Sequence, residues 1–158
     1  MILSKNFEEI LSAFQRYNVD YIIVGGYAVI FHGYVRTTGD LDIWVNPSED
    51  NMQNLIQAFE YLNLNPELTK HLNDIDFNKP FAIKIGDEPL QVDLMNAITG
   101  LRFDKAKKNS ISIITSSELE INFIHLDDLI TNKMLTGRLK DKADVEELQK
   151  IRKYSDNK

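Results

Sequence analysis

The apolar positions of this chain follow two different spacings, which predict a mixture of helices and strands. After Ser4, a typical N-cap residue, apolar side chains recur at helical spacing as far as Tyr17. Short apolar or alternating runs predict strands, and Ser48 is placed to cap a second amphipathic helix. In chain order, the first half is predicted as a helix from Ser4 to Tyr17, a strand at 21–24, a short helix at 27–34, a strand at 41–45 and a helix from Ser48 to Leu62.

The second half of the chain continues this mixed order. Two strands are predicted around a hairpin connection, and two shorter strands follow a polar, basic stretch that forms a helix or a loop. Helical spacing begins again at Asp127, is interrupted at Gly137 and resumes at Asp141. The predicted ranges are 81–85 and 90–95 for the hairpin strands, 86–89 for their connection, 96–110 for the basic stretch, and 112–115 and 121–124 for the short strands.

Together these elements predict an α+β fold, in which a mixed β-sheet of about five strands is flanked by helices. With 158 residues, 43% of them hydrophobic, the chain is long enough for one core and too short for two ordinary ones. We therefore expect a single domain over residues 1–158, with the C-terminal helical segment 127–153 packed on it.

The composition narrows the class of protein. The longest apolar run is broken by two glycines, no charged leader precedes a cleavage site, and the chain has no cysteine. We therefore expect a cytoplasmic protein without a membrane partner. A net charge of −6 argues against a surface that is basic throughout and binds nucleic acid nonspecifically. The basic segments 102–108 and 138–142 are either local patches or solvated helix faces.

Three aspartates are the first candidates for chemistry. The strand period of two places Asp40 and Asp42 on one face, and Asp93 lies opposite its apolar neighbours in the same way. An isolated pair of this kind is also typical of the solvent-facing side of an edge strand. Adjacent carboxylates repel unless a cation lies between them, and oxygen ligands favour Mg²⁺ or Mn²⁺. The three are therefore candidate metal ligands and catalytic residues, with Asp93 helping to activate an attacking hydroxyl.

Two glycines and two basic residues are candidates for phosphate binding. Gly25 and Gly26 lie between a strand and a helix, where amides can approach phosphate oxygens, although such a pair is often only a turn. Lys133 lies on or near an apolar helix face. Its ammonium therefore needs an anionic partner, a triphosphate or an aspartate, unless it reaches past the apolar stripe to solvent. Arg138 is either a phosphate clamp or a surface arginine after a helix cap.

Further polar residues near these motifs have two interpretations each. Arg36, just before the acids, is expected to pair with Asp40 or to touch phosphate. Asp141 and Asp144 open a predicted helix, where capping explains them as well as chemistry does, and we expect capping for Asp144. His32, on a short apolar helix, is more typical of a hydrogen-bonded core histidine than of a catalytic base.

One spacing in the chain is specific. An apolar strand, Gly25 and Gly26, a helix, and then Asp40-Leu41-Asp42-Ile43 on a second strand resembles the signature of the nucleotidyltransferase superfamily that includes DNA polymerase beta. This resemblance implies the polymerase beta-like fold, a glycine turn that holds the triphosphate, and paired acids that bind metal. It also implies that Asp93 is the third acid, on a later strand.

Longer stretches of sequence narrow the resemblance. Residues 25–29, His32-Gly33 and 36–42 look like those of the small prokaryotic AbiEii-type abortive-infection toxins and of the minimal nucleotidyltransferases of toxin–antitoxin pairs. The C-terminal residues that resemble that family's later segment, where such side chains line the nucleotide site, are Asp128-Leu129-Ile130, Lys133, Arg138, Asp141, Asp144 and Leu148. The resemblance therefore implies that Lys133 and Arg138 bind the nucleotide, with Arg36 and Asp141 as additional candidates.

These observations lead to one expected function and one alternative. We expect a metal-dependent enzyme that transfers a nucleoside monophosphate from an NTP to a hydroxyl of an RNA end such as that of a tRNA, a protein side chain or a small molecule. It would act in a toxin–antitoxin or abortive-infection system, with a toxin or antitoxin as partner protein. The alternative is a non-catalytic nucleotide-binding or antitoxin-like interaction module. The intact acids favour the enzyme, because carboxylates held together are costly.

Overall fold

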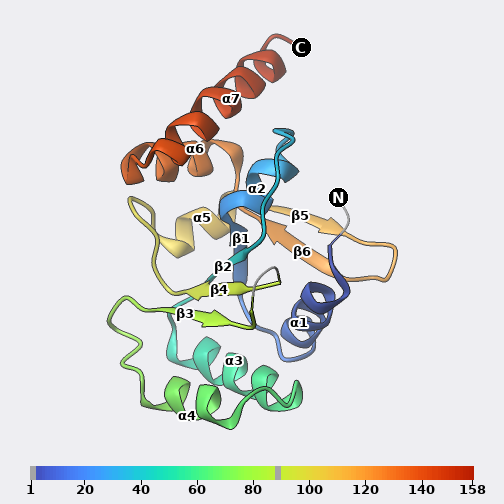
Figure 1. The fold of residues 1–158 in the computed structure, drawn as a ribbon, viewed down its shortest axis with the longest axis vertical. Helices are drawn as coiled ribbons and strands as arrows, with labels where there is room; N and C mark the ends of the chain where they lie inside the picture. Colours follow the sequence, from blue (N-terminus) through green and yellow to red (C-terminus); the bar gives the residue numbers. More distant parts are fainter. Residues whose placement is uncertain (1–2, 88–89) are drawn as a thin grey trace.

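A mixed sheet of six short strands in the order β3-β4-β2-β1-β6-β5 organises the chain. The computed structural model describes residues 3–87 and 90–158 (Figure 1). Strands β1 and β2 are antiparallel, whereas β2 pairs with β4, and β1 with β6, in parallel. Antiparallel pairs β3–β4 and β5–β6 form the two edges. The strands are β1 (Tyr21–Val24), β2 (Leu41–Val45), β3 (Ala82–Ile85), β4 (Val92–Met95), β5 (Ile111–Ile114) and β6 (Glu120–Phe123).

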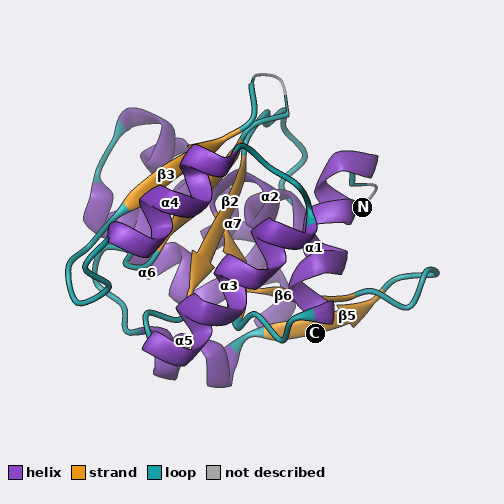
Figure 2. Ribbon diagram, turned by 90° about the horizontal axis from the view of Figure 1, so that it is seen from below, coloured by secondary structure: helices purple, strands orange, loops and turns teal. Residues whose placement is uncertain are grey.

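Seven helices surround this sheet within the described residues. They are α1 (Lys5–Arg16), α2 (Gly25–Phe31), α3 (Glu49–Tyr61), α4 (Pro66–Asp74), α5 (Phe103–Asn109), α6 (Leu126–Thr136) and α7 (Leu139–Asp156). Helices α3 and α4 lie at one end of the long axis and α6 and α7 at the other (Figure 1). Viewed from below, α1, α3 and α4 lie in front of the sheet (Figure 2). None of the helices in the described ranges has the length and apolar character needed to cross a membrane.

The core lies between the central strands and these helices. Phe14 of α1 packs edge to face against Tyr21 of β1 and Phe59 of α3, with ring centroids 5.6 and 5.9 Å apart. Trp44 of β2 packs against Phe103 of α5, at 5.3 Å. Because side chains alternate along a strand, Asp42 shares the face of Trp44. The central strand therefore contributes to the core and to a polar cluster at the same time.

The sequence predicted most of these elements. Ser4 and Ser48 cap α1 and α3 as expected, because the side chain of each accepts a hydrogen bond from the backbone N–H three residues later. Strands β1 and β2 have the predicted bounds. Helix α2 begins at Gly25 rather than at residue 27, because Gly25 adopts φ +65° and turns the chain at once.

Other predicted bounds differ from the structure. The α+β class with a mixed sheet flanked by helices is confirmed, and the sheet has six strands within the described residues, close to the predicted number of about five. The predicted hairpin pairs antiparallel, and part of its connection, residues 88–89, lies outside the described residues. Helix α4 had no sequence prediction, although Asn65 caps it and Pro66 occupies its first turn, both ordinary helix-start signals. Helix α7 begins at Leu139, two residues before the predicted restart.

A testable consequence concerns the turn between α6 and α7. Gly137 has φ +67° and no atom within 4 Å of the position of a Cβ, so a side chain there is disfavoured by the backbone alone. We expect Gly137→Ala to lower the free energy of unfolding by roughly 1–2 kcal/mol and Gly137→Asn by less, because Asn tolerates the left-handed region. Urea unfolding followed by circular dichroism measures this, and equal losses for the two variants would contradict it.

Candidate active site

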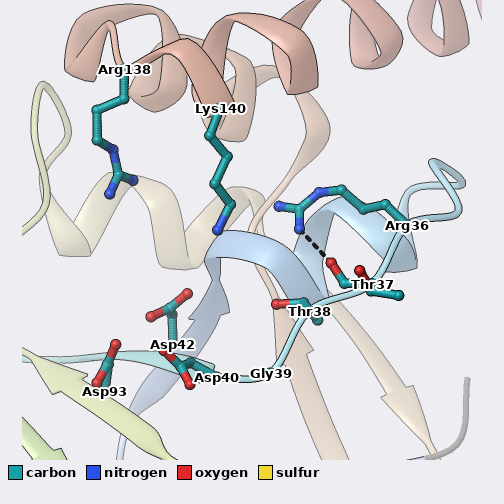
Figure 3. Close-up of a pocket in the computed structure, with 9 residues that line it drawn as sticks. All are labelled: Arg36, Thr37, Thr38, Gly39, Asp40, Asp42, Asp93, Arg138 and Lys140. Atoms are coloured by element: carbon teal, nitrogen blue, oxygen red, sulfur yellow. Dashed lines mark hydrogen bonds between the residues drawn. The ribbon is translucent and has the colours of Figure 1, made fainter. Parts of the chain in front are cut away.

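The three predicted aspartates lie around one cavity. Strands β2 and β4 are neighbours, and their register places Asp42 directly beside Asp93. Asp40 precedes β2, and the three side chains line a cavity of about 630 Å³ (Figure 3). That volume lies in the range of small-molecule sites. One strand pairing thus brings together two aspartates that are separated by fifty residues of chain. The alternation of side chains along each strand did not predict which strands would be neighbours.

The two glycines bring α2 close to these acids. In the antiparallel pair β1–β2, Val24 lies opposite Asp42, so the chain turns into α2 beside that carboxylate. A Cβ on Gly25 would lie only 2.8 Å from the carboxyl carbon of Asp42, and one on Gly26 only 2.9 Å from Cβ of Thr38. Val24, the N-cap residue of α2, makes no side-chain hydrogen bond to the helix. The glycines therefore permit a close approach that any larger residue would block.

Basic side chains face the acids from the start of α7. Arg138 and Lys140 point from this helix across the cavity toward Asp42 (Figure 3). Arg138 was predicted at the site, whereas Lys140 was covered only as part of the basic segment 138–142. Thr37 and Thr38, also on the cavity wall, belonged to the quoted motif but had no predicted role.

The other basic segment lies elsewhere. Arg102 pairs with Asp104, and the ammonium of Lys107 lies 3.1 Å from both a carboxylate oxygen of Asp20 and the carbonyl oxygen of Tyr21. Tyr21 begins β1, and the glycine turn follows the other end of that strand. Segment 102–108 is therefore separate from the acid cluster.

A buried ionic network links α6 and α7 to the segment before β2. The ammonium of Lys133 lies 3.2 Å from Asp141 and 2.9 Å from Asp144, so aspartates supply the anionic partner that the sequence required. Arg36 donates two hydrogen bonds to Asp144, at 2.8 and 2.9 Å. Arg138 donates to both carboxylate oxygens of Asp141, at 2.7 and 3.3 Å.

Two sequence expectations are corrected by this network. Asp144 was expected to cap a helix, but it lies in the second turn of α7, is 1% exposed and binds two basic side chains. A cap would instead lie at the helix start, where the N-cap residue is Arg138. Arg36 pairs with Asp144 rather than with Asp40, and because it also lines the cavity, its contact with phosphate stays a prediction.

Asp141 and His32 have well-defined surroundings. Burial raises the pKa of Asp141, but hydrogen bonds from Arg138 and Thr136 and the charge of Lys133 outweigh it and lower the pKa to about 2. The ring Nε2 of His32 lies 2.7 Å from the carbonyl oxygen of Ile124, and burial lowers the pKa of this histidine. It is the hydrogen-bonded histidine that the sequence favoured.

The acid cluster carries an excess of negative charge. Burial, followed by repulsion from Asp93 and Asp40, raises the pKa of Asp42 to about 6, and the charges of Lys140 and Lys133 only partly oppose this. Asp93 is partly compensated, since its Oδ1 accepts from Gln91 at 2.8 Å and lies 3.6 Å from the ammonium of Lys84. The cluster is therefore suited to bind a cation.

The donor set fits a hard divalent cation that is coordinated by oxygens of both the protein and a substrate. All three acids supply oxygen, which Mg²⁺ and Mn²⁺ prefer. In residues 3–87 and 90–158, however, no three His, Cys, Asp or Glu side chains converge closely enough to hold a metal ion by themselves. Waters and phosphate oxygens would complete the coordination, as is usual for Mg²⁺.

A second cavity adjoins the first at Asp42, Asp93 and Arg138. Its volume is about 340 Å³, and Met95, Ala97 and Ile98 contribute apolar side chains to its lining. The other residues that line it are Val24, Gly25, Thr99, Asn132, Lys133, Thr136 and Asp141. The acids and Arg138 thus stand between a polar chamber and a more apolar one.

Comparisons with known proteins agree with this architecture. Residues 1–156 match the model of a family described as nucleotidyltransferase of unknown function (DUF6036). The crystal structure of a putative nucleotidyltransferase from Thermotoga maritima has a similar fold, with a TM-score of 0.59 and 14% sequence identity. The alignment covers 98% of this chain and 92% of that chain. No curated protein sequence matches the chain significantly. The predicted nucleotidyltransferase fold is thereby confirmed, and the AbiEii-type affiliation stays a prediction.

The raised pKa of Asp42 predicts how stability depends on pH. The folded protein retains this proton to a higher pH than the unfolded chain does, so stability falls as the pH rises from about 4 to about 6. In metal-free buffer at pH 7, we expect Asp42→Asn to raise the free energy of unfolding by roughly 3 kcal/mol. The gain should disappear near pH 4, where Asp42 is neutral. A gain that persists at pH 4 would contradict this cause.

The buried network predicts a large cost for removing one charge. Asp144→Asn keeps the shape but leaves Lys133 and Arg36 without a full negative partner, so we expect a loss of roughly 3–5 kcal/mol in the free energy of unfolding. The exposed Asp156 lies on the same helix, and Asp156→Asn should change stability by less than about 0.5 kcal/mol. Chemical denaturation compares the two, and similar values would refute a structural role for the network.

Proposed function

Because the chain belongs to a family of nucleotidyltransferases of unknown function, we propose that it transfers a nucleoside monophosphate from an NTP to a hydroxyl acceptor. The observation that carries this proposal is the pairing of Asp42 with Asp93 on adjacent strands, beside the Gly25 turn and facing Arg138 and Lys140. Acids, close-approach glycines and cations around one cavity are the parts that phosphoryl transfer requires.

The proposed reaction exchanges one bond to the α-phosphorus for another. The acceptor oxygen forms a bond to this phosphorus as the bond to the bridging oxygen of the β-phosphate breaks, and pyrophosphate leaves with that electron pair. The hydroxyl proton passes to Asp93. Its Oδ2 is suited to accept the proton, since Gln91 and Lys84 both contact Oδ1 of this carboxylate. Stabilisation of charge and positioning supply most of the rate.

Asp40, Asp42 and Asp93 would hold Mg²⁺ or Mn²⁺, which, when bound, supplies positive charge to the phosphate oxygens. The amides at Gly25 and Gly26 lie where phosphate oxygens can approach α2. A nucleotide that spans the two cavities would place its phosphates near Arg138 and its nucleoside against the more apolar wall. The likeness of the motifs to AbiEii-type toxins supports a role in a toxin–antitoxin or abortive-infection system.

Nucleotide binding is the first test of this function. We expect titration calorimetry with Mg²⁺ to show that at least one of the four NTPs binds the native chain, and that Asp42→Asn/Asp93→Asn loses this binding. Asp74, exposed on α4 at the other end of the molecule, provides the matched control, and Asp74→Asn should bind as the native chain does. Unchanged affinity of the double variant would refute the assignment of the site.

Transfer itself is measured with α-³²P-labelled NTPs. The native chain is incubated with total RNA, with cell protein or with a metabolite extract, and covalent label and pyrophosphate are followed together. We expect label in one acceptor class. We expect none with Asp42→Asn, because Asn lacks the negative charge with which Asp42 would hold the metal ion. Binding without label in any acceptor would instead favour the non-catalytic module.

A further inference from the structure

The basic side chains around the acids differ in what they already bind. Arg36, Lys133 and Arg138 are each joined to an aspartate at 3.2 Å or less. Lys140 lines the cavity wall, and no ion pair or side-chain hydrogen bond involves it in the part of the chain that the structure describes. The four cations that the basic motifs supply therefore fall into three engaged side chains and one free one.

The engaged cations are costly to divert to a substrate. Asp141 and Asp144 are 0% and 1% exposed, so a carboxylate that lost its partner would remain buried and uncompensated. Lys133 is itself 5% exposed and lies between both. These contacts fix α7 against α6 and the segment before β2. A cation that turned toward a substrate would break its part of this contact.

Lys140 combines freedom with direction. It follows Arg138 by two residues, and its ammonium points across the cavity toward the carboxylates (Figure 3). Its charge acts on Asp42 more strongly than that of the buried Lys133 does. A lysine is a flexible point charge with three donors, suited to follow phosphate oxygens that move during a reaction.

On the basis of the proposed function, we propose that Lys140, rather than Lys133, is the lysine that binds the β- and γ-phosphates of the donor nucleotide and stabilises the negative charge of the departing pyrophosphate. Two nitrogens of Arg138 already donate hydrogen bonds to Asp141, so Arg138 contributes less than Lys140 to the binding of these phosphates. Lys133 is a positioning residue, because it holds the carboxylates that orient α7.

The test compares Lys140→Met with Lys142→Met. Lys142 is exposed on the same helix two residues later, on another side of it, and it does not line the cavity. Calorimetry with Mg²⁺ uses the NTP that binds the native chain most tightly and the NMP with the same base. We expect Lys140→Met to weaken the NTP by about tenfold or more and the NMP by less than about twofold, with Lys142→Met near the native values. Lys140→Arg, which restores the charge, should recover most of the affinity.

Each result decides between the two proposals. If the native chain binds no NTP, the proposed function fails and this inference fails with it. If the native chain binds an NTP and Lys140→Met binds it equally well, the function stands and the role of Lys140 is refuted. Equal weakening of NTP and NMP, or equal effects of Lys140→Met and Lys142→Met, would also refute a specific contact with the β- and γ-phosphates. Unfolding temperatures near the native value show that the variants are folded.

Discussion

The buried ion pairs of Lys133, Asp141, Asp144 and Arg36 determine where the C-terminal helices sit. Arg36 and Asp144 are 108 residues apart in the chain, and Lys133 joins α6 to two aspartates of α7, so these pairs hold separate elements together rather than stabilise one helix. Charges buried to this degree are tolerable only when each finds its partners with good geometry. The orientation of α7, and with it the direction of Arg138 and Lys140, therefore depends on this network, whose members Arg36, Lys133 and Asp141 also line the two cavities.

The acid cluster has the opposite electrostatic character. In the network, Asp141 and Asp144 each contact two basic side chains. At the cavity, burial and the repulsion of Asp93 and Asp40 raise the pKa of Asp42, and the lysines near it only partly oppose this. Backbone geometry imposes this repulsion, because the β2–β4 register holds Asp42 and Asp93 side by side. A site built this way gains most from a ligand that brings cations and phosphates together.

The helix that carries the cations separates two tasks within one short segment. Asp141 and Asp144 face inward and secure the helix, while Arg138 and Lys140 face the cavity. This arrangement explains how a chain with a net charge of −6 presents positive charge at one wall of its cavity. The charge is local, and it needs no basic surface elsewhere.

The sequence by itself determined most of the elements, though not helix α4, and the chemistry of single positions. Helix caps, the glycine turn and the period of two are local properties, so Ser4, Gly25 and the faces of Asp40, Asp42 and Asp93 could be identified without a structure. The position of Lys133 on an apolar helix face also indicated that its ammonium needs an anionic partner. The tertiary structure alone decided which anion that is, that Asp144 binds Arg36 instead of capping a helix, and that Lys140 rather than segment 102–108 faces the acids. Strand register and helix docking bring together residues far apart in the chain, and no local pattern specifies those partners.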